Sequence, residues 1–255
     1  MSEEGATGLP PYVLSAWGRQ PRRTKGPHPE LSLSRIVEAA IRIADQDGLG
    51  AVSMGRVAQA VGSSTMALYR HVGGKDELVT LMVDTSYGMP PKPPTADGWR
   101  SGLSHWAWSS RAAMQKHRWG VRVPIQGPPM TPCQLAWLEQ GLAALRDTPL
   151  TESQKLSTML LVSGYVRNEV SVGIDLDEGF LAGGGGDDPM RLYRRVLEQL
   201  TDKTSFPSLH AVIAAGVLEQ TDDPDDEFDF GLERLLDGIE ALVVASAPVR
   251  RRRRT

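Results

Sequence analysis

Cysteine is almost absent from this chain of 255 residues, because Cys133 is the single one. One thiol supports neither a disulfide framework nor a cysteine-based zinc site. The chain also lacks any run of 18 apolar residues, which a membrane-spanning helix would need. Its first residues, MSEEGATGLPPYVL, carry two acids and two prolines in place of the basic start of a secretion signal. We expect a cytoplasmic protein with no membrane partner.

Catalytic signatures are absent from the sequence as well. It contains no Gly-x-Ser-x-Gly, no phosphate-binding loop, no His-Glu-x-x-His and no dinucleotide-binding glycine pattern. The glycine run at 183–186 follows no strand and precedes no Lys-Ser or Lys-Thr, so we interpret it as a connecting loop. We therefore expect no enzymatic activity, no cofactor and no metal.

Charge is distributed unevenly along the chain. Residues 1–75 hold nine Lys or Arg against six Asp or Glu, whereas residues 76–249 hold 14 basic and 25 acidic side chains. A basic first part on an acidic remainder indicates one surface suited to a polyanion. Five arginines at 250–254 end the chain, and we interpret them as a solvated tail or one that binds polyanions non-specifically.

Hydrophobic spacing predicts helices throughout and no strand. Four short helices are expected near 33–47, 54–61, 64–71 and 75–88, and longer ones follow from residue 99. The segment GMPPKPPTADG at 88–98 separates the two groups, because its clustered prolines forbid a continuous helix. The expected fold is all-α, with a helix-turn-helix DNA-binding domain at 32–88 and a larger ligand-binding and dimerisation domain at 97–247. A flexible basic arm is expected at 1–31 and a basic tail at 248–255.

The stretch GSSTMALYRHVGGKDEL, from Gly62 to Leu78, predicts a DNA-reading helix. Gly62 suits the tight turn between two short helices, since glycine accepts a positive φ at little cost. The small side chains of Ser63, Ser64, Thr65 and Ala67 make the next helix thin enough at its start for a major groove. Lys75 then begins the following helix, where a cation and a helix N-terminus can both attract phosphate.

The segment VSMGRVAQAVGSSTMALYRHVGGKDELVTLMVD resembles the DNA-binding domain of tetracycline-repressor (TetR) family transcriptional regulators. LVSGYVRNE and FDFGLERLLDGIEAL resemble the ligand-binding domain of tetracycline repressors. The resemblance implies phosphate contacts from Ser53 and Arg56, base contacts from Ser63, Thr65, Met66 and Ala67, and backbone contacts from Tyr69, Arg70, His71 and Lys75. Arg70 has a second possible role at a guanine, and Tyr69 a second one in sealing the core. Gly73-Gly74 departs from the bulkier residues of the family and predicts a looser turn.

Two further features have more than one interpretation. The basic residues Arg19, Arg22, Arg23 and Lys25 form either a solubilising tail or an arm that enters the minor groove. The tryptophans after the proline segment form either ordinary core or a pocket for a flat, partly apolar ligand. The predicted pocket residues are His105, Trp106, Trp119, Gln134, Trp137, Tyr165, Asn168 and Glu169.

These features together predict a homodimeric repressor that a small molecule of unknown identity releases from a pseudo-palindromic operator on double-stranded DNA. The last helix and the long helix before the glycine run are expected to form the dimer interface as a four-helix bundle. One alternative is a helical small-molecule-binding protein or enzyme that does not act through DNA. Another is a regulator without a ligand that acts through a protein partner, with tryptophans closing its pocket.

Overall fold

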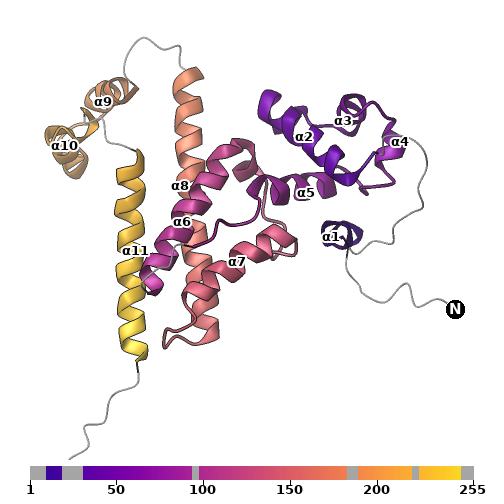
Figure 1. Cartoon of the computed structure of the whole chain (residues 1–255). Helices are drawn as coiled ribbons and strands as arrows, with labels where there is room; N and C mark the ends of the chain where they lie inside the picture. The colour runs from indigo at the N-terminus through magenta and orange to yellow at the C-terminus, as the bar shows by residue number, and fades with distance from the viewer. Residues whose placement is uncertain (1–9, 19–30, 94–97, 183–188, 220–223, 248–255) are drawn as a thin grey trace, which may run out of the picture.

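The computed structural model describes residues 10–18, 31–93, 98–182, 189–219 and 224–247. These residues form eleven α-helices and contain no strand, which confirms the all-α class. Figure 1 shows four short helices gathered at one end of the molecule as a head, and longer helices forming a body beside it. Within the ranges just given, no helix is both long and apolar enough to cross a membrane.

The head consists of four helices, and a serine N-cap starts each of the first three. Ser32 lies directly before the first of them, and its Oγ accepts from the backbone N–H of Arg35 at 3.2 Å, as expected of an N-cap serine. The fourth helix ends at Gly88, whose φ of +64° is strained for other residues. The bounds are α2 Leu33–Asp47, α3 Met54–Ala60, α4 Thr65–Leu68 and α5 Lys75–Tyr87.

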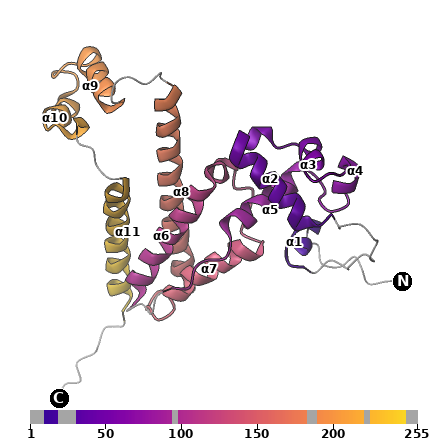
Figure 2. The same ribbon diagram turned by 45° about the horizontal axis from the view of Figure 1, so that its top comes forward.

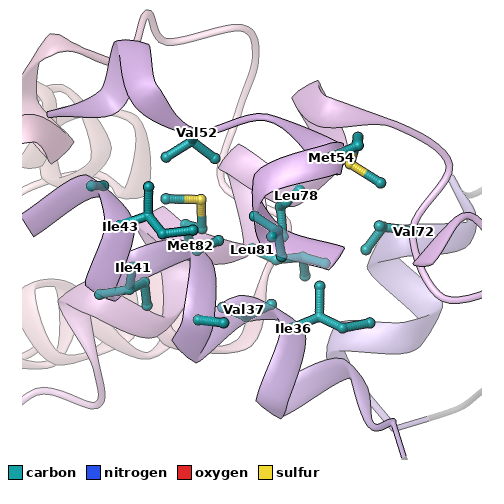
Figure 3. Packing of buried hydrophobic residues seen from close by; sticks show 14 of the residues in the cluster. Ile36, Val37, Ile41, Ile43, Val52, Met54, Val72, Leu78, Leu81 and Met82 are labelled. Carbon is teal, nitrogen blue, oxygen red and sulfur yellow. The ribbon is translucent and has the colours of Figure 1, made fainter. Parts of the chain in front are cut away.

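The head has its own hydrophobic core, shown in Figure 3. Ile36 of α2 and Leu78 and Met82 of α5 are fully buried, and Val52 and Val72 close the core from the connecting segments. Each buried aliphatic side chain contributes about 1.5–3 kcal/mol of transfer free energy. The core therefore lies mainly between α2 and α5, and α4 adds little besides Leu68.

The body surrounds a second core, formed by α6, α7, α8 and α11. On α11, Phe228, Leu232, Leu236 and Ile239 form an apolar stripe at helical spacing, and all four are buried. A capping box starts α8: Thr151 N–H donates to Gln154 Oε1 at 2.8 Å, and Gln154 N–H donates to Thr151 Oγ1 at 3.3 Å. The bounds are α6 Trp99–Lys116, η2 Arg118–Arg122, α7 Pro132–Ala144, α8 Glu152–Ala182 and α11 Pro224–Ser246.

A small outlying unit connects α8 to α11. It consists of α9 Pro189–Leu200, α10 Pro207–Ala214 and the short turn η3 Val217–Glu219. Figures 1 and 2 both show α9 and α10 beside each other, away from the head and beyond the ends of α8 and α11. Leu192 and Tyr193 on α9 and Phe206 before α10 are exposed, so part of the apolar surface of this unit is uncovered.

The N-terminal segment differs from the expected flexible arm. A helix, α1 Pro11–Ala16, forms there, and Val13 within it is buried. The prediction of a wholly flexible arm is wrong for residues 10–18, because two prolines start a helix that packs on the head. Arg19, Arg22, Arg23 and Lys25, the glycine run at 183–186 and the arginines at 250–254 lie outside the described residues.

Candidate nucleic-acid interface and its connection to the body

The turn between α3 and α4 is built as the sequence predicts. Gly62 has a φ of +68°, in the left-handed region that favours glycine. Ser63 N–H donates to the carbonyl of Ala58 at 2.9 Å, which closes the turn. Ser64 Oγ then accepts from Ala67 N–H at 3.2 Å and starts α4. The turn therefore fixes the direction in which α4 leaves the head.

The outer surface of α4 is uncovered. Thr65 and Arg70 are exposed, Met66 is 74% exposed and Tyr69 is 49% exposed. A methionine this open has no role in the core, so Met66 is available to touch a ligand such as a base edge. Tyr69 projects from the end of the helix, which fits the phosphate role better than the core-sealing one.

Ala67 differs from the other predicted base-contacting residues in its burial. It is 8% exposed and sits on the inner side of α4 beside the fully buried Leu68. A four-residue helix has one inner face, and Ala67 and Leu68 occupy it. The methyl group of Ala67 therefore offers a base much less surface than the side chain of Met66, which is 74% exposed.

The start of α3 carries a serine and an arginine with existing partners. Ser53 Oγ accepts from Arg56 N–H at 3.2 Å as the helix N-cap, and its hydroxyl hydrogen stays available to donate. Arg56 Nη2 lies 2.5 Å from Asp47 Oδ2 at the end of α2, and both side chains are partly exposed. An exposed ion pair contributes little to stability, so a phosphate can compete for Arg56 at small cost.

His71 follows α4 and differs from its neighbours in its titration. Partial burial lowers the pKa of His71, and the positive charge of Arg70 lowers it further. The imidazole is therefore neutral at neutral pH and offers one N–H donor without a charge. In the phosphate role, His71 would contribute a neutral hydrogen bond beside the charged Arg70 and Lys75.

The Gly73-Gly74 turn is held in place, contrary to the expected looseness. Gly73 N–H donates to Glu77 Oε2 at 2.7 Å, so the carboxylate of α5 holds the preceding backbone. A Cβ at Gly73 would lie 2.8 Å from Glu77 Oε2, closer than real Cβ contacts, whereas a Cβ at Gly74 would meet nothing within 4 Å. Gly73 is needed for this close approach, and the exposed Lys75 begins α5 directly after Gly74.

One connection between head and body joins α5 to α7. Asp84 is 7% exposed, and its Oδ1 accepts from the N–H groups of Cys133 at 3.0 Å and Gln134 at 3.1 Å. The carboxylate of the head thus caps a helix of the body, where it also meets the positive helix end. Burial, and secondarily Asp84, raises the pKa of the Cys133 thiol to about 11, so the thiol stays protonated.

A second connection joins α2 to η2. Asp45 Oδ1 accepts from His117 Nδ1 and from Trp119 Nε1, each at 2.8 Å. From the other side, Arg167 of α8 donates to the carbonyls of Val121 and Val123. Trp119 packs within the head core and is thus separated from Trp106 and Trp137, which belong to the body core. The sequence does not indicate this packing, because Trp119 belongs to a segment of the body while its indole ring is buried in the core of the head.

The other predicted pocket residues are divided between separate side-chain clusters. Trp106 and Trp137 are buried and meet edge to face with centroids 5.9 Å apart, and Tyr87 of α5 meets Trp137 at 5.6 Å. Trp106 Nε1 donates to the carbonyl of Trp137, and Trp137 Nε1 donates to the carbonyl of Gly88. This aromatic cluster, Tyr87, Trp106 and Trp137, fills the space where α5 meets the body. Gln134 lies at the nearby start of α7.

Tyr165 and Glu169 belong to a different cluster, whose centre is Arg111 of α6. Arg111 Nε lies 3.0 Å from Glu169 Oε2, and its Nη1 lies 2.5 Å from Asp225 Oδ1 of α11. Its guanidinium also lies over Phe228, on which Tyr165 stacks. Arg111 was not among the predicted site residues, since nothing in the sequence marks it as buried. Asn168 is exposed, and the half-buried His105 pairs with Ser109 at 3.4 Å.

A pocket of about 470 Å³ lies elsewhere, at the end of the body away from the head. Trp99 and Gly102 of α6, Gln140 and Ala144 of α7 and Val243 of α11 are among its lining residues. None of the eight predicted pocket residues lines it. Tryptophan count and helical spacing therefore did not locate this pocket.

Comparisons with known proteins cover both head and body. Residues 36–82 match the family described as bacterial regulatory proteins, tetR family, and residues 90–243 match the tetracyclin repressor-like C-terminal domain. The HTH-type transcriptional repressor DrrR1 of Streptomyces coeruleorubidus is 35% identical over 244 residues, covering 89% of this chain and 84% of DrrR1. Tetracycline repressor protein class E of Escherichia coli is 27% identical over 143 residues, covering 55% of this chain and 67% of that protein.

Among solved structures, apo ActR from Streptomyces coelicolor has a TM-score of 0.69 and 27% identity, over 88% of this chain and 100% of ActR. ActR in complex with actinorhodin has the same TM-score and identity, over 87% of this chain and 99% of that one. The two matched family ranges leave α1 outside them.

Proposed function

The chain belongs to the TetR family of bacterial regulatory proteins, and on that premise we propose that it represses transcription by binding a pseudo-palindromic DNA operator and releases it when a small molecule binds the body. The observation that carries the proposal is α4: a helix with an uncovered outer face, held by a rigid α2–α5 core. We propose the head at 32–88 as the DNA-binding domain and 97–247 as the regulatory and dimerisation domain. We assign the chain no catalytic step.

The proposed DNA contacts come from α3, α4 and the start of α5. Met66, Thr65 and Ser63 face the bases, and Arg70 reaches a phosphate or a guanine. The phosphate contacts come from Ser53, Ser64, Arg56, Tyr69, His71 and Lys75, with Arg22, Arg23 and Lys25 adding charge from the N-terminal segment. Ala67 is left out because it is buried.

The test is a titration of an operator selected from a random DNA library. Lys75→Ala and Tyr69→Ala should each weaken binding roughly five- to twentyfold, because each removes one phosphate contact. Lys92→Ala is the matched control, since it removes an exposed lysine from the linker after the head. If Lys75→Ala and Tyr69→Ala bind the operator as tightly as Lys92→Ala does, the proposed DNA contacts of α4 and α5 are wrong.

A homodimer is proposed because both long helices expose apolar side chains. Leu156, Leu160 and Leu161 on α8 and Phe230 and Leu242 on α11 are at least 37% exposed. A four-helix bundle of α8 and α11 with their symmetry mates would cover them and set two heads at successive major grooves. Leu160→Asp should dissociate the dimer in a sedimentation experiment, while Leu192→Asp, on α9, should not. A wild-type chain that sediments as a monomer would contradict the proposal.

The effector is proposed to act on the aromatic cluster. This cluster joins α6 and α7 to the end of α5 through the Trp137–Gly88 hydrogen bond, so a molecule that separates Trp137 from Gly88 would also move α5. An effector of this kind must prefer the arrangement that does not bind DNA. ActR is bound by actinorhodin, and we propose a flat, partly apolar molecule here too.

Actinorhodin itself is a suitable probe for this step. It should release the operator from wild-type chain, and Trp137→Phe should shift the midpoint of release at least roughly fivefold, because it removes the hydrogen bond that couples the cluster to α5. Trp99→Phe, at the distant pocket, is the matched control. A shift for Trp99→Phe alone would place the effector site at that pocket.

A further inference from the structure

The helix α1 lies at the joint between head and body, outside the family ranges matched. Figures 1 and 2 both place it next to α5 and near the start of α7. We propose that α1 is a strap that restrains the angle between head and body, in addition to the connections that the two domains make themselves.

The local sequence explains why a helix forms here at all. Pro11 occupies the first turn, where its missing N–H removes no helical bond. Trp17 N–H donates to the carbonyl of Val13 at 3.1 Å, and Gly18, with a φ of +63°, ends the helix. A helix of six residues is not stable alone in water. Its contacts with the rest of the chain must hold it.

On the head side these contacts are apolar. Val13 is 3% exposed, and Tyr12 and Ala16 pack against the head core. The core of the head lies mainly between α2 and α5. Helix α1 is therefore fixed to the same hydrophobic core that supports α4. A movement of the head therefore carries α1 with it.

On the body side the contact is a hydrogen bond. Trp17 Nε1 donates to the carbonyl of Met130 at 2.9 Å. Met130 lies two residues before Pro132, the first residue of α7, whose first turn Asp84 of α5 caps. The Trp17–Met130 bond therefore crosses, from the side, the joint that the Asp84 cap and the Trp137–Gly88 hydrogen bond cross directly.

The arrangement has a consequence for regulation. If the head turns relative to α7, the Trp17–Met130 bond must lengthen together with the Asp84 cap. The strap therefore lowers the population of turned heads, and an effector must supply a correspondingly larger difference in affinity between the two arrangements. Removing the strap should make the head easier to turn without changing α4.

Amide hydrogen exchange on the full-length chain, without DNA or ligand, tests the strap directly. The N–H groups of Cys133 and Gln134 are protected by Asp84, so their exchange reports opening of the joint. Trp17→Phe removes the indole donor and should accelerate their exchange roughly three- to tenfold, the effect of one lost hydrogen bond. Trp17→Ala should accelerate it at least as much.

The matched control is Ile125→Ala, which removes an exposed apolar side chain from the same loop. It should leave exchange at Cys133 and Gln134 as in the wild type. Unchanged exchange at these two amides in both Trp17 variants would overturn the strap. Acceleration spread evenly over α2 would overturn it as well, because α1 would then be only a part of the head core. Operator binding by the wild type is a separate measurement, so failure of the strap leaves the proposed DNA function standing.

Discussion

The head and the body are both built from α-helices, but they differ in which side chains they expose and which they bury. In the head, three helices hold a fourth whose outer face is exposed, and in the body the aromatic and charged side chains fill the space between long helices. The residues that we propose for DNA binding are therefore exposed on the surface of the head. In the body the corresponding side chains are buried. Trp106 and Trp137 donate hydrogen bonds to backbone carbonyls, and Arg111 is enclosed by carboxylates and aromatic rings. A short exposed helix is easier to interpret than a buried aromatic cluster.

The largest expected effect tests whether head and body are separate cores. Leu68→Asp places a carboxylate at a fully buried position of the head and should destabilise it by about 4 kcal/mol or more. Operator binding should be lost while the body keeps its fold, because Leu68 belongs to the head cluster alone. Hydrogen exchange measured helix by helix checks this. Equal loss of protection in α8 would show that the two cores unfold as one.

The converse change acts on the body. Arg111→Ala leaves Glu169 without its buried partner and should cost about 3 kcal/mol of body stability. Denaturant unfolding measures this loss, and Arg146→Ala, on an exposed arginine, should stay within about 0.5 kcal/mol of the wild type. At low denaturant the head should still bind operator. A head that loses protection first would contradict the separation of the two regions.

A smaller effect is expected at the joint between the regions. Asp84→Asn keeps an acceptor for Cys133 and Gln134 but removes the charge, at a cost of about 1 kcal/mol. Because Asp84 contributes to the raised pKa of the Cys133 thiol, this pKa should fall from about 11 toward its ordinary value. The thiolate fraction then rises at a given alkaline pH. The pH dependence of alkylation by iodoacetamide measures the shift, and an unchanged midpoint would contradict it.

The smallest effect distinguishes two neighbouring glycines of the head. Gly73→Ala should cost about 1 kcal/mol and weaken operator binding a few-fold, because its Cβ displaces the Glu77 carboxylate from the Gly73 amide. Gly74→Ala should be tolerated, since its φ of 175° is ordinary extended backbone and its Cβ meets no atom within 4 Å. Parallel thermal melts and operator titrations compare the pair. Equal effects would show that the Glu77 contact does not fix the turn.

The comparison also explains which features could be predicted from the sequence. Helix boundaries in the head depend on neighbours in the chain, such as Ser32, Ser53 and Ser64 as N-caps and Gly62 in its turn, so local patterns locate them. The apolar stripe of α11 and the capping box of α8 are local in the same sense.

Pairings across the fold could not be predicted in this way. Trp119 enters the head core, and Arg111 meets Asp225 across more than a hundred residues. No spacing along the chain encodes which helix a tryptophan will face. For the same reason α1 was missed, because a six-residue helix is stable only where a distant surface receives it.

The brevity of α4 has a consequence for how this regulator can change over time. Thr65, Met66 and Arg70 are exposed and add nothing to the head core, so substitutions there are close to neutral for folding. A lineage can therefore explore new operators at these positions while the scaffold stays intact. The same freedom makes them the natural positions for a designed library that retargets the protein to another promoter.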